Sequence, residues 1–185
     1  MLVRRRSVVL TTVLCGALAV GGCSTTETGN AQPSSTTDLS AATAALWDPC
    51  SQIPDSTLRS LDIDLASKRS GILGAEEPGW KICLWEEADF PPNYGISVAT
   101  TIYTVDQVRA KPNNVDFKDI TVAGRSGVQF RQSNYDVDEE CNLVFPTASG
   151  SAQFGVINTT SKSKSMAPCD RIRKVAEAIL QDIPK

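Results

Sequence analysis

The stretch Trp80-Lys81-Ile82-Cys83-Leu84-Trp85 indicates the fold class, because its apolar residues alternate with a period of two. Positions 80, 82 and 84 fall on one side and positions 83 and 85 on the other, which is typical of a strand that is apolar on both faces. After the turn at Pro91-Pro92-Asn93, residues 94–102 alternate in the same way and have high β-propensity. These two segments predict neighbouring antiparallel strands.

The chain beyond this pair predicts four more strands. Residues 120–122 and 128–131 suggest a hairpin that turns at Gly124-Arg125. Residues 142–145 and 152–157 suggest a second hairpin, joined across Ser149-Gly150. The result is an antiparallel sheet of about six strands.

Helical signals flank and interrupt these strands. Asp48 is placed to cap a short helical turn that begins at Pro49, residues 54–61 predict a second short helix, and residues 105–110 a single turn. Residues 68–79 read as a loop. Residues 168–183 form the clearest helix, with one apolar stripe made by Ile172, Val175, Ala176, Ile179 and Leu180. The predicted fold is therefore α+β: an antiparallel sheet with short N-terminal helices and a C-terminal amphipathic helix.

Residues 1–22 have the pattern of a bacterial signal peptide. The cationic Arg4-Arg5-Arg6 is followed by an uncharged apolar run over residues 7–20, which is shorter than a membrane-spanning helix needs. The run ends in Val20-Gly21-Gly22-Cys23, which resembles the lipobox at which a bacterial cysteine is acylated and the preceding bond is cut. We expect Cys23 to be the lipid-anchored N-terminus, because several acyl chains on one residue suffice for stable anchoring.

Alternatives to this reading remain open. An ordinary signal peptide with an incidental cysteine would carry the same charge pattern, and Arg5-Arg6 also admits twin-arginine export. With Cys23 as the anchor, the expected location is the outer face of the cell membrane.

Three segments are expected: the signal peptide 1–22, a lipidated tether 23–40 and a single domain 41–185. Residues 24–40 are nearly all polar or small, so they bury too little apolar surface to order themselves. Without the leader the chain has 15 basic and 21 acidic residues, a net charge of −6. This charge argues against nucleic acid as a partner, and membrane contact is expected only through the anchor on Cys23.

Four cysteines remain for the exported domain, Cys50, Cys83, Cys141 and Cys169, and an even number predicts two disulfides. Three pairings are possible, and spacing alone does not choose among them. The motifs Asp48-Pro49-Cys50, Cys83-Leu84-Trp85 and Pro168-Cys169-Asp170, together with the strand that opens at Cys141, resemble an actinobacterial lipoprotein family, with mycobacterial members, of unknown function. The resemblance implies sequential pairing, Cys50 with Cys83 and Cys141 with Cys169, and a cell-envelope location. It implies no activity.

Catalytic patterns are weak. The chain has no histidine, which excludes Ser-His-Asp and Cys-His sites. Ser161-Lys162-Ser163-Lys164 matches the serine-lysine nucleophile pattern but lacks its companion motifs. A dense acidic cluster before Cys141 could hold calcium; it comprises Asp136, Asp138, Glu139 and Glu140. A second acidic group, Glu86, Glu87 and Asp89, could pair with it as acid and base for glycoside hydrolysis. Both groups are better interpreted as solvated loops. We assign no catalytic residue, metal site or cofactor.

The few aromatic residues suggest where a ligand could bind. Trp80 and Trp85 lie on opposite faces of one strand, and Trp85 is expected to pack on the bridge at Cys83. The terminal helices are too small to cover both faces of the sheet. Apolar surface should therefore remain on the face that they leave uncovered. We expect a non-catalytic module that binds an envelope component, a lipid or small molecule, or a protein partner. Its site should be the sheet face or groove that the terminal helices leave uncovered, lined by whichever of Trp80, Tyr94 and Tyr103 points away from them. A carboxylate-dependent glycosidase is the alternative.

Overall fold

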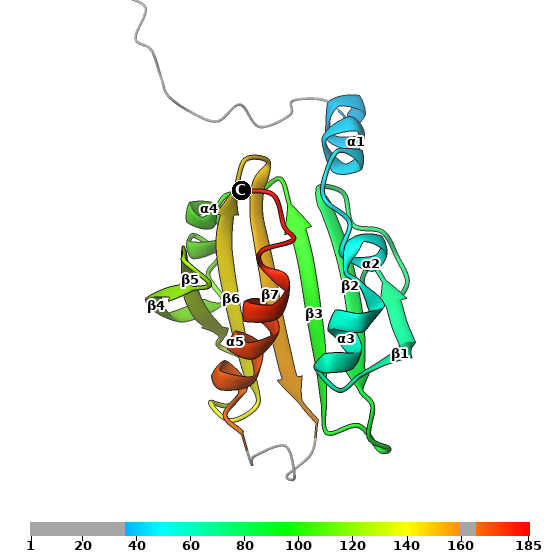
Figure 1. Ribbon diagram of the computed structural model, residues 1–185. Coiled ribbons are helices and arrows are strands. Elements are labelled where there is room, and N and C mark those ends of the chain that lie inside the picture. Colours follow the sequence, from blue (N-terminus) through cyan, green and yellow to red (C-terminus); the bar gives the residue numbers. More distant parts are fainter. Residues whose placement is uncertain (1–35, 160–165) are drawn as a thin grey trace, which may run out of the picture. The chain divides into compact units, whose positions relative to one another are not determined.

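One antiparallel sheet of seven strands forms the centre of the structure, in the spatial order β1-β2-β3-β7-β6-β5-β4 (Figure 1). The computed structural model describes residues 36–159 and 166–185. The predicted leader, Cys23 and the 161–164 motif lie outside these residues. The strands are β1 (Ile63–Ser70), β2 (Trp80–Glu87), β3 (Tyr94–Thr101), β4 (Asn114–Val122), β5 (Arg125–Gln132), β6 (Glu140–Thr147) and β7 (Gly150–Asn158).

The count of about six strands was one too low, because β1 was missed. This strand lies at the sheet edge, and its pairing with β2 is irregular between Asp64 and Arg69. Only Ile63 is fully buried, so the strand has no sustained apolar alternation from which it could be recognised. The predicted loop 68–79 is accordingly shorter, since its first three residues belong to β1.

Within residues 36–159 and 166–185, five short to medium helices accompany the sheet: α1 (Thr36–Ala44), α2 (Pro49–Gln52), α3 (Asp55–Ser60), α4 (Val105–Arg109) and α5 (Pro168–Ile179). The Asp48 carboxylate accepts a hydrogen bond of 2.9 Å from the Cys50 amide, which is the cap predicted for α2. Helix α5 ends at Ile179, four residues before the predicted end at Ile183, and Leu180 is its C-cap. In the described part of the chain, none of the helices has the length and apolar character that a bilayer crossing requires.

Helix α1 begins inside the predicted tether 23–40, so that prediction was wrong for its last five residues. Asp38 in the first turn interacts favourably with the helix dipole, and the following alanines are strong helix formers. The Thr43 hydroxyl also accepts a hydrogen bond of 2.8 Å from the Gly79 amide. Helix α1 is thereby attached to the loop that enters β2.

Helices α2, α3 and α5 lie on one face of the sheet (Figure 1). Alternate residues of the central strands point toward these helices and form the core together with the apolar stripe of α5. The strand residues in this core include Ile96, Val98, Leu143, Phe145, Phe154 and Val156. The disulfide Cys50–Cys83 joins α2 to β2, and Cys141–Cys169 joins β6 to α5. This is the sequential pairing implied by the family resemblance, and each bridge fixes a helix to the sheet.

The opposite face, which we call the open face, is covered in part by α4. Strand β3 lies at the centre of the sheet and β4 at its edge, so the connection between them must cross β7, β6 and β5. Val108 of α4 is buried in this crossing against Val128, Phe130 and Val144. The crossing leaves separate areas of the open face on either side of α4.

Candidate functional site

Trp80 and Tyr103, two of the three predicted ligand-binding aromatics, lie close together. Their ring centroids are 5.8 Å apart, and the Lys111 ammonium lies 5.1 Å from the centroid of the Trp80 ring. The Ser151 hydroxyl donates a hydrogen bond of 2.7 Å to the Tyr103 carbonyl oxygen. These contacts hold the pair against the sheet at the start of the α4 crossing, with both rings half-buried.

Tyr94 does not join them. It points to the same face as Ile96 and Val98, toward the helices, and is 5% exposed. The Arg171 guanidinium lies 3.9 Å from its ring centroid. Burial, followed by the charge of Glu87, raises the pKa of the Tyr94 hydroxyl. Of the three candidate aromatics, Tyr94 is therefore the one that faces the helices, because alternation places it in the core.

A groove lies elsewhere on the open face, where β5 separates from β6. The two strands pair only at Val128–Phe130 of β5 with Asn142–Val144 of β6. The next position on β6 that faces the groove is Pro146, which has no amide hydrogen and cannot donate to a neighbouring strand. On β5, Gly127 leaves room for the Phe145 ring, which approaches its Cα closely.

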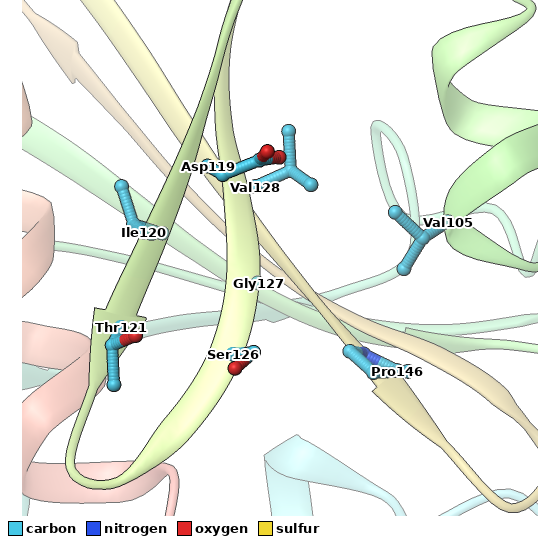
Figure 2. Close-up of a pocket in the computed structure, with 8 residues that line it drawn as sticks. All are labelled: Val105, Asp119, Ile120, Thr121, Ser126, Gly127, Val128 and Pro146. Atoms are coloured by element: carbon cyan, nitrogen blue, oxygen red, sulfur yellow. The ribbon is translucent and has the colours of Figure 1, made fainter.

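The groove has a volume of about 570 Å³, which is in the range of small-molecule sites. Figure 2 shows its walls: Val105 of α4 stands on one side, the β4–β5 hairpin on the other, and Pro146 between them. The complete lining is Val105, Asp119, Ile120, Thr121, Ser126, Gly127, Val128 and Pro146. Apolar side chains therefore face a few hydroxyl groups and one carboxylate, a combination that suits an amphipathic ligand.

Asp119 is the only ionisable residue of this lining. Its carboxylate accepts a hydrogen bond of 2.5 Å from Arg109, and the side chain is 87% exposed. The Arg109 guanidinium also lies 5.3 Å from the centroid of the Phe117 ring. The pair places one partly neutralised acidic group at the rim, where it can accept hydrogen bonds from a ligand.

Glu86 and Glu140, one from each acidic group of the sequence, lie on strands that are not neighbours. Glu86 and Glu140 occupy the same cross-strand row but are separated by three strand spacings, so their backbones lie about 14 Å apart. Glu86 is bound to Arg69 at 2.7 Å, and Glu87 accepts a hydrogen bond from the Asn93 amide. This geometry lends no support to the glycosidase alternative. Among the described residues, no group of three or more His, Cys, Asp or Glu is arranged to hold a metal ion.

Glu140 has a structural position instead. It is buried on β6 and accepts hydrogen bonds from the Gln132 amide, at 3.0 Å, and from the Asn142 side chain. Desolvation raises the pKa of its carboxyl group. The carboxylate thus ties the ends of β5 and β6 together.

The groove residues were not predicted from the sequence, although a signal was present. Gly127 and Pro146 both interrupt segments with strand patterns, and such residues within strands often mark a bulge, an edge or a close approach. Only the folded structure shows that the two residues line one groove.

Comparisons with known proteins give a family and no activity. No curated protein and no solved structure matches the chain. A family model described as protein of unknown function (DUF3558) matches residues 18–182, which is most of the chain and all of the sheet. The chain therefore belongs to this family of proteins of unknown function.

Proposed function

We propose that this protein is a non-catalytic binding module, anchored by lipid at Cys23 to the outer face of the cell membrane, that holds a small amphipathic ligand in the groove beside α4. The observation that carries the proposal is the groove itself. It is an open groove whose lining is mostly apolar and includes a few hydrogen-bonding groups, a combination that ligand sites use.

The anchor is supported by the sequence around Cys23. A cationic segment, an uncharged apolar run and small residues directly before the cysteine occur in the order that lipoprotein processing requires. The domain itself is acidic and has no charge attraction to anionic lipid. An acyl anchor would supply that membrane attachment.

The anchor is tested with Cys23→Ala. We expect the wild-type protein in the membrane fraction with an acylated N-terminal peptide, and the variant in the soluble fraction with unchanged thermal stability. A variant that stays firmly in the membrane fraction would show that the apolar run persists as an uncleaved anchor.

The groove is tested on the soluble Cys23→Ala protein isolated from its native cells, by native mass spectrometry followed by extraction of whatever is bound. Ser126→Phe should fill the groove and reduce ligand occupancy at least about tenfold. Ser133→Phe, an exposed serine outside the groove, is the matched control and should leave occupancy unchanged. A ligand that survives Ser126→Phe but is lost in Trp80→Ser would move the site to the aromatic pair.

A further inference from the structure

The loop between β1 and β2 begins with a turn that has an unusual residue at its tip. Ile72 and Ala75 exchange two backbone hydrogen bonds of 2.9 Å each, and they enclose Leu73 and Gly74. Both enclosed residues have positive φ, +52° for Leu73 and +80° for Gly74. Two such residues define the primed hairpin turn, whose first position normally holds Asn, Asp or Gly.

Leu73 is unfavourable there for two independent reasons. A leucine in the left-handed region is strained by the proximity of its Cβ to the backbone. Its side chain is also 98% exposed, and that of the neighbouring Ile72 is 53% exposed. Neither the turn nor the core gains from an apolar side chain at this position. Strain of this kind that persists without a structural gain commonly marks a functional position.

The position of the turn indicates what it contacts. The same loop ends at Gly79, whose amide is hydrogen-bonded to Thr43 of α1. Helix α1 begins 13 positions after Cys23, so the chain between them reaches at most about 45 Å. An anchor on Cys23 would therefore keep this end of the sheet within reach of the bilayer. The effective concentration of the loop at the bilayer surface would then be in the millimolar range.

We propose that Ile72 and Leu73 insert into the lipid surface as a second, reversible membrane contact. This inference rests on the proposed lipid anchor, because two exposed apolar side chains bind a bilayer weakly on their own and the tether makes the contact effective. Insertion also orients the domain. Trp80, Thr101, Ser151 and Pro146 form one cross-strand row, so the groove lies at the same end of the sheet as this loop.

The test is hydrogen exchange of the mature lipoprotein in phosphatidylcholine–phosphatidylglycerol vesicles, compared with soluble Cys23→Ala protein. Amides of residues 71–76 should exchange at least about fivefold more slowly on vesicles. Leu73→Asn should abolish this protection, and because Asn suits the turn, the variant should be at least as stable as wild type. Phe90→Asn is the matched control, since Phe90 is 97% exposed at the opposite end of β2, and it should leave the protection intact.

The outcomes separate the two proposals. An acylated N-terminal peptide without protection at residues 71–76 overturns the insertion alone. Protection that depends on Phe90 rather than on Leu73 overturns it as well. An unacylated Cys23 overturns the anchor, and the insertion with it.

Discussion

The guanidinium of Arg125 donates a hydrogen bond of 3.0 Å to the carbonyl oxygen of Leu180, the residue that caps the end of α5. Two further bonds, of 2.8 and 2.9 Å, run from Arg125 to the carbonyl oxygens of Ile183 and Pro146. Arg125 is buried, and desolvation lowers its pKa. One side chain thereby connects the β4–β5 hairpin, the end of β6 and the C-terminal helix.

Replacing Arg125 with methionine should destabilise the fold substantially. The variant leaves three carbonyl oxygens without their donor, and a hydrogen bond to a charged group contributes about 1.5–3 kcal/mol. Part of this loss is offset because a buried methionine, unlike the guanidinium, has no charge to desolvate. We expect a loss of about 2–4 kcal/mol in the free energy of unfolding, measured by denaturant titration. Arg173→Met is the control, because Arg173 makes an exposed hydrogen bond of 3.4 Å to Thr121, and a similar loss there would contradict this assignment.

The two disulfides should each stabilise the domain to a similar extent. They close loops of 33 and 28 residues, for which the chain-entropy model gives about 3–4 kcal/mol. Cys141→Ala with Cys169→Ala should therefore release α5 and lower the midpoint of urea unfolding. Non-reducing peptide mapping of wild-type protein should link Cys50 to Cys83 and Cys141 to Cys169. A peptide that links Cys50 to Cys169 would contradict the pairing.

Gly127 should tolerate no side chain. A Cβ added there would lie 2.6 Å from the Phe145 ring carbon Cε1 and 2.6 Å from the Val144 carbonyl oxygen. Because Phe145 is in the core, Gly127→Ala should cost about 1–3 kcal/mol of stability. Gly95→Ala is the control, since its Cβ would make an ordinary contact of 3.5 Å.

A second variant shows whether the loss of stability comes from the clash with Phe145 or from a general destabilisation of β5. Phe145→Leu creates space beside Gly127, so combining it with Gly127→Ala should cost less than the sum of the two single changes. Strictly additive losses in thermal unfolding would show that the Phe145 ring is not what excludes the side chain.

How far the sequence predicts this structure depends on the range of the interactions. The alternation from Tyr94 to Val98 and the stripe of α5 are local patterns, so the central strand and the terminal helix were predicted. The same alternation placed Tyr94 and Ile96 on one face, but it could not show that α5 covers this face. The groove depends on residues of α4, β4, β5 and β6 that come together only through the order of the strands. Strand β1 was missed because an edge strand needs little apolar sequence.

The raised pKa of Glu140 predicts how stability changes with pH. Its folded-state pKa is raised by burial above the unfolded value, so its contribution to stability is full below the unfolded pKa and is lost as the pH rises through the folded pKa. The free energy of unfolding attributable to Glu140 should therefore decrease from about pH 4 upward.

Other carboxylates also titrate in this range, so the relevant quantity is the difference in the free energy of unfolding between wild type and Glu140→Gln. The stability of wild type relative to the variant should be greatest at low pH. It should decrease as the pH rises, because glutamine carries no charge to desolvate. Denaturant titrations from pH 4 to pH 8 measure it. A difference that is constant with pH, or that moves the other way, would mean that the hydrogen bonds from Gln132 and Asn142 outweigh the desolvation of the carboxylate.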